Sequence, residues 1–329
     1  MESVSWKPSC TLRTWKQRKD LILGIRSFFH TRNVLEVEVP VLSRAMGTDP
    51  HLDYFPVESL DGHPRFLTTS PEFHLKRLLA ADFGDIYSLG KAFRNGETGE
   101  RHNGEFTILE WYRIGFDWNA LMSEVAELCR MLAGSLDTRG AQLARNPLRQ
   151  ITWREAYRIH CGFDPMDASL EDVKTCARQR NIPALAEATQ EEWLDYLMVT
   201  AIEPQLGKDG PEFLTTYPES QAALAQVERD AEGNSWARRF ELYLDGVELC
   251  NGYQELVDAS EQEQRFKYDL EKRKRLGKPQ PPVDEHFLEA LRNGMPACSG
   301  VALGVDRLIM LLLGKERLSE VLLFPDDRA

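Results

Sequence analysis

An Asp-Gly pair in the second half of the chain predicts a tight turn. Asp245-Gly246 lies between two short runs in which apolar and polar residues alternate, and this combination strongly favours a two-residue β-hairpin. If the hairpin forms, Tyr243 pairs with Glu248, and Glu241 lies one diagonal away on the same face of the sheet. The sequence therefore predicts two carboxylates close together on one face of an antiparallel pair of strands.

The predicted pair of carboxylates is a candidate metal site. No Lys or Arg lies between Glu241 and Glu248 in the sequence, so the two negative charges would repel each other unless a cation is bound. Mg2+ is a hard cation that takes oxygen ligands, which makes it the expected metal. On this pattern alone, two solvated acids on an exposed strand remain the alternative.

The composition is typical of a soluble globular protein. The chain has 329 residues and is 42% hydrophobic, which is enough for one large domain or two ordinary ones. Its longest apolar run, residues 308–313, is far too short to cross a bilayer, and the N-terminus has no secretory signal pattern. The six cysteines are scattered without Cys-x-x-Cys spacing, which indicates reduced thiols. These features predict a cytoplasmic protein with no membrane partner.

The charge argues against nucleic acid as a partner. The net charge is −12, whereas a protein that relies on phosphate contacts usually carries a positive surface. One basic run, residues 272–278, is explained most simply as the solvated end of a helix that stops at Gly277.

The order of apolar and turn-forming residues predicts an α+β fold. The expected elements, in chain order, are a helix over 15–33, a strand over 34–40, a helix that opens at Ser70-Pro71-Glu72, strands over 85–94 and 106–116 joined by a mobile loop at 95–100, a mostly helical region over 117–235, a short helix over 284–293, a Gly-rich strand over 299–305 and a final helix from Leu308. Strands joined by hairpins and long helical excursions favour a mainly antiparallel sheet flanked by helices. No linker divides the chain, so we expect residues 1–329 to form a single domain.

The strand expected over 106–116 carries a candidate binding face. Period-two geometry places four side chains on one face: Phe106, Ile108, Glu110 and Tyr112. Phe106 and Glu110 would then be about 13 Å apart, at ~3.4 Å per residue, which suits an adenosine monophosphate joined to a small acyl group. The aromatic ring could stack on the base, and the acid and phenol could hold an amine. A half-buried core strand is the alternative, although a buried Glu would need a partner.

Two arginines lie where phosphates could be bound. Arg94 ends the strand before the mobile loop, and Arg307 follows Gly304 at the start of the last helix. Arg stays charged and can bind phosphate through two parallel hydrogen bonds, and Gly allows a ligand to approach the backbone closely. A strand-end Arg alone is more often a surface residue, so the argument depends on the whole set of segments.

Together, these segments resemble the catalytic domain of class II aminoacyl-tRNA synthetases, in particular lysyl-tRNA synthetase. Three stretches are similar to the three class II motifs: residues 34–42 to motif 1, the dimer strand that ends in Pro40; residues 93–113 to motif 2; and residues 300–307 to motif 3. Two strings are specific to the lysine branch, Arg-His-Asn-x-Glu-Phe-Thr from Arg101 and Glu-x-x-Asn-Gly-aromatic-x-Glu-Leu from Glu248. The resemblance runs from about Trp15 to the C-terminus and implies an ATP-dependent enzyme that works as a homodimer through the segment near Pro40.

The resemblance also implies which residues hold ATP. Arg94 would contact the α-phosphate and Arg307 the γ-phosphate, so these two are the expected catalytic residues. Glu241 and Glu248 would bind Mg2+, and Phe106 would stack on the adenine. The other positions that match nucleotide-binding residues are Asn95, Gly96, His102, Asn103, Leu249 and Gly304, together with Glu248.

A second group of residues would hold the amino acid. Around its distal ammonium the resemblance places Glu72, Tyr112 and Glu255. Glu110 and Asn251 would hold the amino-acid head, and Tyr253 would pack along the aliphatic stem. The remaining substrate-binding positions are Ser70, Pro71 and Ala302. Several carboxylates in one pocket suit a dibasic amino acid, whose charge would otherwise be poorly compensated.

Three departures from lysyl-tRNA synthetases refine this interpretation. Motif 2 usually reads Arg-x-Glu, but here Gly96 takes the place of the acid and Glu97 follows it, and Ala302 stands where Gly is usual. The chain also starts directly at the first catalytic helix, so we expect no anticodon-binding domain. A lysine-activating domain without that module resembles a truncated paralogue family of the lysyl-tRNA synthetases, the elongation factor P lysine ligases.

This second resemblance implies a function. The chain would activate lysine, preferably (R)-β-lysine, as an adenylate with ATP and Mg2+, and would transfer it to the ε-amine of a lysine on elongation factor P. Ala302 fits a substrate whose amino group is shifted by one carbon, and tRNA would be a poor partner. Three alternatives remain open: a related enzyme with a tRNA or small-molecule acceptor, an amide-forming synthetase that releases a free product, and a regulatory pseudoenzyme that binds nucleotide.

Overall fold

The computed structural model describes residues 6–134 and 136–329. Within these residues the chain forms a nine-stranded sheet, whose strands lie in the order β1 (Leu35–Glu36), β5 (Ile86–Phe93), β6 (Glu105–Ile114), β12 (Cys298–Gly304), β11 (Val247–Gln254), β10 (Ser235–Leu244), β8 (Glu212–Pro218) and β7 (Arg149–Thr152), with β9 (Val227–Arg229) paired to β10. Neighbouring strands are antiparallel except for the outer pairs β1–β5 and β7–β8. A small sheet contains β2 (Leu42–Ser43), β4 (Arg65–Leu67) and β3 (Pro56–Val57).

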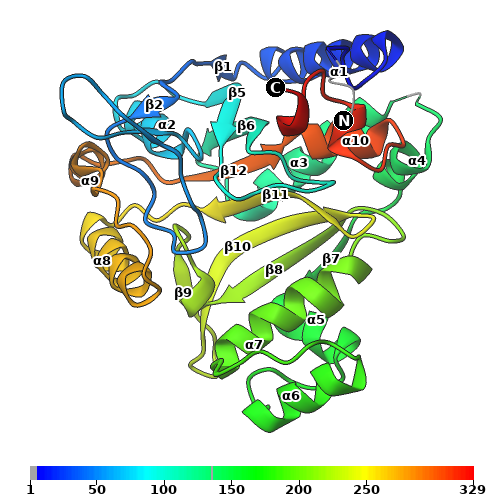
Figure 1. Cartoon of the computed structure of the whole chain (residues 1–329). Coiled ribbons are helices and arrows are strands. Elements are labelled where there is room, and N and C mark those ends of the chain that lie inside the picture. The colour runs from blue at the N-terminus through cyan, green and yellow to red at the C-terminus, as the bar shows by residue number, and fades with distance from the viewer. Residues whose placement is uncertain (1–5, 135) are drawn as a thin grey trace.

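Helices cover both faces of the large sheet (Figure 1). They are α1 (Leu12–His30), α2 (Glu72–Ala80), α3 (Trp118–Ala133), α4 (Arg139–Arg145), α5 (Trp153–His160), α6 (Leu170–Gln179), α7 (Gln190–Leu197), α8 (Ala259–Arg275), α9 (Glu285–Arg292) and α10 (Val305–Leu312), with short π or 3₁₀ segments η1 (Met198–Ile202), η2 (Glu203–Gln205), η3 (Glu219–Gln221), η4 (Leu318–Glu320) and η5 (Asp326–Arg328). The expected α+β fold, with a mainly antiparallel sheet flanked by helices, is confirmed. Across the described part of the chain, none of these helices combines the length and the apolar character needed to span a bilayer.

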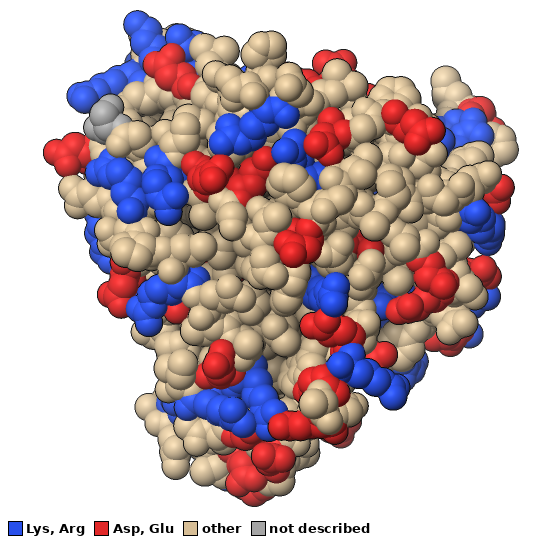
Figure 2. Space-filling model, turned by 180° about the vertical axis from the view of Figure 1, so that it is seen from behind, with Lys and Arg blue, Asp and Glu red and all other residues tan. Residues whose placement is uncertain are grey.

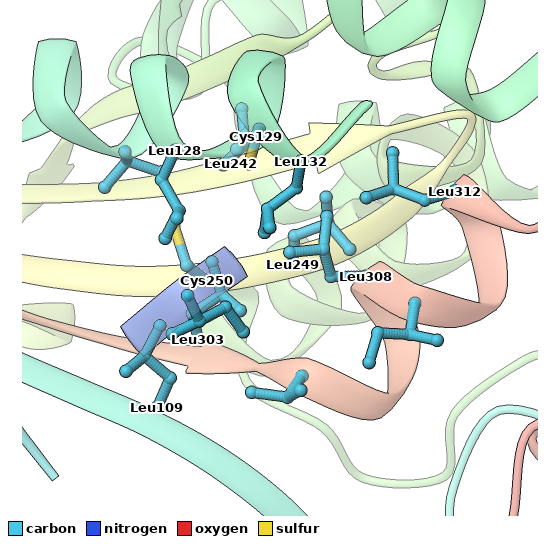
Figure 3. Packing of buried hydrophobic residues seen from close by; sticks show 14 of the residues in the cluster. Leu109, Leu128, Cys129, Leu132, Leu242, Leu249, Cys250, Leu303, Leu308 and Leu312 are labelled. Atoms are coloured by element: carbon cyan, nitrogen blue, oxygen red, sulfur yellow. The ribbon is translucent and has the colours of Figure 1, made fainter. Parts of the chain in front are cut away.

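One face of the sheet packs against α1, α3 and α10. Strand alternation turns Leu109, Leu303 and Val301 toward these helices, where they meet apolar side chains such as Leu128 and Leu308. Figure 3 shows this core between α3, α10 and the central strands. Because every second residue is committed to this core, the intervening residues of the same strands face the opposite side of the sheet.

The opposite face is covered only at its margins, by two further apolar clusters. At one margin α2, α8 and α9 pack together through Leu75, Phe266 and Phe287. At the other, α5, α6 and α7 pack on β8 and β10, with Trp153 and Tyr157 in the interior. The central strands β6, β12, β11 and β10 are left open between these two groups of helices, and this gap positions the site described below.

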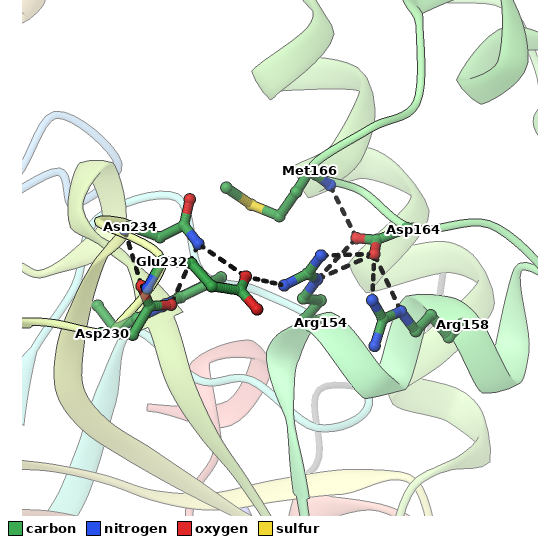
Figure 4. Close-up of polar contacts among 8 residues, drawn as sticks. Arg154, Arg158, Asp164, Met166, Asp230, Glu232 and Asn234 are labelled. Atoms are coloured by element: carbon green, nitrogen blue, oxygen red, sulfur yellow. Dashed lines mark hydrogen bonds and ion pairs between the residues drawn. The ribbon is translucent and has the colours of Figure 1, made fainter.

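An ion network ties α5 to the turn before β10. Asp164 accepts hydrogen bonds from Arg154 and Arg158 and, at 3.1 Å, from the backbone N–H of Met166. Arg154 also lies 3.7 Å from the carboxylate of Glu232 in the β9–β10 turn (Figure 4). These contacts attach the helical margin to the sheet.

The predicted hairpin is confirmed in register. Asp245 and Gly246 have φ angles of 51° and 73°, the positive values that a tight two-residue turn of this kind requires. Tyr243 pairs with Glu248 across β10 and β11, as expected from the sequence.

Several other predictions need correction. The region expected to be mostly helical, residues 117–235, also contains β7, β8 and β9. The strand expected over 34–40 pairs with β5 over Leu35–Glu36 only, and the final helix begins at Val305 instead of Leu308. In the basic run, Arg273 is not solvated: it is fully buried and donates hydrogen bonds to the carbonyl oxygens of Asp49, Leu52 and Pro279.

Candidate active site

The open face of the central strands forms the floor of a cavity of about 610 Å³. Strand register places its side chains in rows. One row crosses four adjacent strands through Glu110, Ala302, Asn251 and Glu241. The next row contains Tyr112, Gly300, Tyr253 and Arg239. Residues from motif-like segments nearly 200 positions apart are therefore direct neighbours in the sheet.

A β-bulge brings Glu248 to this floor. Leu242 pairs with Cys250, but Tyr243 pairs with Glu248, so β11 carries one extra residue, Leu249. Leu249 and Cys250 both lie in the apolar core on the other face. The bulge therefore turns Glu248 to the same face as Asn251, although three positions separate them; bulges commonly re-aim side chains next to active sites.

One end of the cavity holds a buried acid bonded to two hydroxyl groups. Glu110 is 2% exposed, and its two carboxylate oxygens accept hydrogen bonds from Tyr112 and Ser70, each at 2.7 Å. Burial, followed by the nearby Glu72 carboxylate, raises the pKa of Glu110 to about 8. The Ser70 hydroxyl also accepts a hydrogen bond from the backbone N–H of Glu72 at 3.1 Å, which fixes the start of α2.

Two further acids at this end share a buried lysine. Lys76 Nζ lies 2.7 Å from Glu72 and 2.6 Å from Glu255. Burial raises the pKa of Glu255 to about 7, although Lys76 pulls it down. Gly300 leaves the space for this arrangement, because a Cβ atom there would lie 2.2 Å from the Tyr112 ring and 2.5 Å from Glu255. Close packing at this end thus requires glycine at Gly300; a Cβ at Gly304 would meet nothing closer than 3.8 Å.

The other end of the cavity holds the two candidate phosphate-binding arginines. Arg307 donates to the backbone carbonyl of Glu248 at 3.1 Å, lies 3.4 Å from its carboxylate and contacts His102 Nε2 at 2.6 Å. Partial burial and the charge of Arg307 lower the pKa of His102. Arg94 lies over the Phe106 ring at 5.1 Å and 3.5 Å from Glu97. Glu97 thus stands beside Arg94 although Gly96 replaces the usual acid.

An arginine accompanies each candidate metal acid, although no Lys or Arg lies between the two acids in the sequence. Glu241 forms an ion pair with Arg239 and accepts a hydrogen bond from Tyr243 at 2.7 Å. Glu248 faces Arg307. Even so, negative charge is in excess here: partial burial and Glu241 raise the pKa of Glu248.

A third acid adds to that excess. Partial burial, Glu241 and Glu248 raise the pKa of Glu203, in η2, to about 7. No group of three or more metal-binding side chains is assembled among residues 6–134 and 136–329. The donor set therefore fits Mg2+ that is held by one or two carboxylates and completed by phosphate oxygens, which is how this ion is usually bound. It does not fit a metal caged by protein alone.

Most, but not all, of the predicted site residues line the cavity. Those that do are Ser70, Glu72, Arg94, His102, Asn103, Phe106, Glu110, Tyr112, Glu241, Glu248, Leu249, Asn251, Tyr253, Glu255, Ala302, Gly304 and Arg307. Pro71, Asn95 and Gly96 lie outside the lining. The Asn103 amide is already engaged, because it donates to the carbonyl of Glu105 at 2.7 Å and accepts from the backbone of Asp326 at 2.9 Å.

Sequence reasoning missed several charged residues of the site, among them Lys76, Arg239 and Glu203. The spacing of Glu72 and Lys76 was a signal for the first, since residues four apart on a helix are neighbours. Arg239 lies two positions before Glu241 on the same strand face and was visible in the same way. Glu203 belongs to a short irregular segment, and no local pattern pointed to it.

Comparison with known proteins identifies the class. The family model of the class II tRNA synthetases (D, K and N) matches residues 6–328. The chain therefore belongs to the class II tRNA synthetases.

Similarity to curated proteins identifies the family within this class. The chain is 43% identical over 337 residues to the elongation factor P–(R)-β-lysine ligase of Salmonella arizonae. It is 42% and 41% identical, each over 335 residues, to the proteins of the same name from Hamiltonella defensa and Yersinia enterocolitica. All three alignments cover 100% of this chain and 99% of the relative. Within its class, the chain is thus a ligase of the elongation factor P–(R)-β-lysine ligase family.

Proposed function

We propose that this ligase activates lysine, preferentially (R)-β-lysine, as an adenylate with ATP and transfers it to the ε-amine of a lysine on elongation factor P. The observation that carries the proposal is one cavity with buried carboxylates at one end and Arg94 and Arg307 at the other. The names of the relatives support lysine and elongation factor P as the two partners.

The acidic end is suited to a substrate with two ammonium groups. Glu110 and Glu255 are 2% and 1% exposed, and buried acids of this kind need positive partners. We assign the distal ammonium to Glu72, Tyr112 and Glu255, and the head to Glu110 and Asn251, with Tyr253 along the stem. Glu110 and Asn251 flank Ala302 in one row of the sheet, which supports their acting on the same part of the substrate.

The arginine end is suited to a nucleoside triphosphate. Phe106 offers a ring to the adenine, and Arg94 and Arg307 offer charge to the α- and γ-phosphates. In the first step the substrate carboxylate attacks the α-phosphorus in line with the leaving pyrophosphate, and the two guanidinium groups stabilise the negative charge that develops. Mg2+ held by Glu241 and Glu248 would supply further charge neutralisation when bound. In the second step the acceptor amine attacks the acyl carbonyl, and AMP leaves.

ATP–pyrophosphate exchange with a panel of amino acids tests the activation step. We expect exchange with lysine and (R)-β-lysine and none with amino acids that carry a single ammonium group. Binding of ATP without exchange in the presence of any amino acid would instead support the regulatory pseudoenzyme.

Ala302 is proposed to select between the two lysine isomers. Its methyl group lies between Glu110 and Asn251 in the sheet row, so Ala302→Gly would open space beside the head of the substrate. We expect the ratio of kcat/KM for α-lysine over (R)-β-lysine to rise by about tenfold, the usual scale of a methyl-sized change. An unchanged ratio in steady-state exchange kinetics would place selectivity elsewhere, for example in the loop at residues 45–48, which also lines the cavity.

tRNA is expected to be a poor acceptor. The net charge is −12, and Figure 2 shows acidic and basic side chains interspersed over the face it presents, whereas tRNA binding depends on phosphate contacts. Acylation of tRNA-Lys should therefore be much slower than modification of elongation factor P under the same conditions. Equal rates for the two acceptors would contradict the proposed acceptor.

A homodimer and a cytoplasmic location complete the proposal. Around Pro40, the apolar side chains of Leu35, Val41 and Leu42 are 50%, 42% and 44% exposed, which suits a contact between two copies of motif 1. All six cysteines are free thiols, as is usual in a reducing compartment.

A further inference from the structure

Lys76 is a buried cation placed directly behind the acidic end of the cavity. It is fully buried, and its Nζ bridges Glu72 Oε1 and Glu255 Oε2. Glu72, Glu110 and Glu255 all line the cavity, whereas Lys76 does not. The lysine therefore contacts one oxygen of each of two acids from the rear.

The second oxygen of Glu255 is not used by Lys76: Oε1 is buried and has no hydrogen-bond partner in the described structure. Glu255 Oε1 points toward Gly300, since a Cβ there would meet it at 2.5 Å, and Gly300 lines the cavity. A substrate ammonium could therefore contact Glu255 without displacing Lys76. This arrangement argues against competition between Lys76 and the substrate for the same oxygen.

The charges at this end are matched to a substrate with two ammonium groups. With Glu72, Glu110 and Glu255 ionised, the three acids and Lys76 leave two uncompensated negative charges. A lysyl or β-lysyl group carries two positive charges. Without Lys76, a third negative charge would be left among these side chains, and an unpaired buried charge is costly.

We propose that Lys76 is a positioning residue: an internal counter-ion that aims Glu72 and Glu255 at the cavity and sets the pocket charge for a diammonium substrate. This inference rests on the proposed function, because it assumes that a lysine isomer binds at this end.

The surroundings of Glu255 determine how this role depends on pH. The titratable groups that face it are Glu72 and Lys76 from α2, Glu110 and Tyr112 from β6, Tyr253 from β11, which ends just before Glu255, and Cys298 from β12. Lys76 is the one cation among these groups. Even with Lys76 present, burial raises the pKa of Glu255 to about 7. Removal of Lys76 should therefore raise this pKa further and leave Glu255 protonated at neutral pH.

The test compares Lys76→Met with Lys267→Met. Lys267 makes the same kind of contact on α8, 2.7 Å from Glu263 four residues earlier, but its side chain is 69% exposed. We expect Lys76→Met to weaken the Kd for lysine at pH 7 roughly thirtyfold, on the scale of a lost buried charge partner, with recovery as the pH rises toward 9. The Kd for ATP, and both Kd values of Lys267→Met, should stay close to wild type.

Calorimetric titration distinguishes the possible failures. If wild-type protein binds lysine and Lys76→Met binds it equally well or more tightly, with the same pH dependence, Lys76 has no positioning role. If wild-type protein binds no lysine isomer, the proposed function fails and this role fails with it.

If Lys76→Met folds poorly at pH 7, thermal unfolding tests whether Lys76 acts as a counter-ion. A Glu side chain can have a higher pKa in the folded state than its unfolded value of ~4.3. The free energy of unfolding then falls as the pH rises through the folded pKa, because folding opposes ionisation of this group. The deficit in Tm relative to wild type should therefore be smaller at pH 5.5 than at pH 8. A deficit that does not change with pH would mean that Lys76 contributes packing alone.

Discussion

Glu248→Gln should reduce lysine-dependent ATP–pyrophosphate exchange by roughly a hundredfold to a thousandfold, the usual cost of losing one strong electrostatic contact to a reacting phosphate. Glu248 and Glu241 lie on one face of the sheet, because Glu248 pairs with Tyr243 and Tyr243 is two residues from Glu241 on the same strand. The amide keeps the shape of the side chain but not its charge, so the fold should be retained. Exchange rates as a function of Mg2+ concentration, with circular dichroism as the check on folding, provide the measurement.

A matched control for this variant is Glu228→Gln. Glu228 is also paired with an arginine, Arg238, but it lies on the outer strand β9 with its side chain 46% exposed. Its replacement should leave exchange unchanged. Normal exchange and normal Mg2+ dependence in Glu248→Gln would refute the metal assignment.

Glu255→Gln should weaken the binding of lysine by roughly a hundredfold and change the binding of ATP by only a few fold. The variant removes one of the charges that face the substrate ammonium and also leaves Lys76 with a single acid partner; breaking such a buried pair typically costs ~3 kcal/mol. Isothermal titration of each ligand separates the two effects. Equal losses for lysine and ATP would mean that Glu255 supports the whole cavity and not the ammonium alone.

The pH dependence of lysine binding provides a second readout for the same variant. In the wild type, the pKa values of Glu255 and Glu110 are raised to about 7 and about 8, and only the ionised form attracts an ammonium group. The affinity for lysine should therefore increase from pH 6 to pH 8. In Glu255→Gln the part of this increase near pH 7 should disappear.

Local turn chemistry made part of the site predictable. Two residues with positive φ angles are required at a tight hairpin turn, and Asp-Gly satisfies this requirement, so the pairing of Tyr243 with Glu248 followed from the sequence. Strand alternation likewise placed Glu110 and Tyr112 on one face, and both line the cavity. In each case the relevant geometry is set by neighbours in the chain.

Long-range burial could not be predicted in the same way. In the described part of the chain, two Glu-x-x-x-Lys pairs make the same 2.7 Å contact, Glu72–Lys76 and Glu263–Lys267. The first is buried behind the cavity and the second is in solvent, and only the packing of other elements distinguishes them. Strand β8 was missed for a similar reason. Residues 212–215 are all buried, so no alternation of buried and exposed residues marks them as a strand.

The central claim is tested most directly by mass spectrometry of elongation factor P after incubation with this protein, ATP and either α-lysine or (R)-β-lysine. We predict that one lysyl group is added to a single lysine side chain of elongation factor P, faster with the β-isomer, and that nothing is added when ATP is omitted. Elongation factor P that stays unmodified with both isomers, while the same preparation catalyses lysine-dependent ATP–pyrophosphate exchange, would contradict the proposed acceptor.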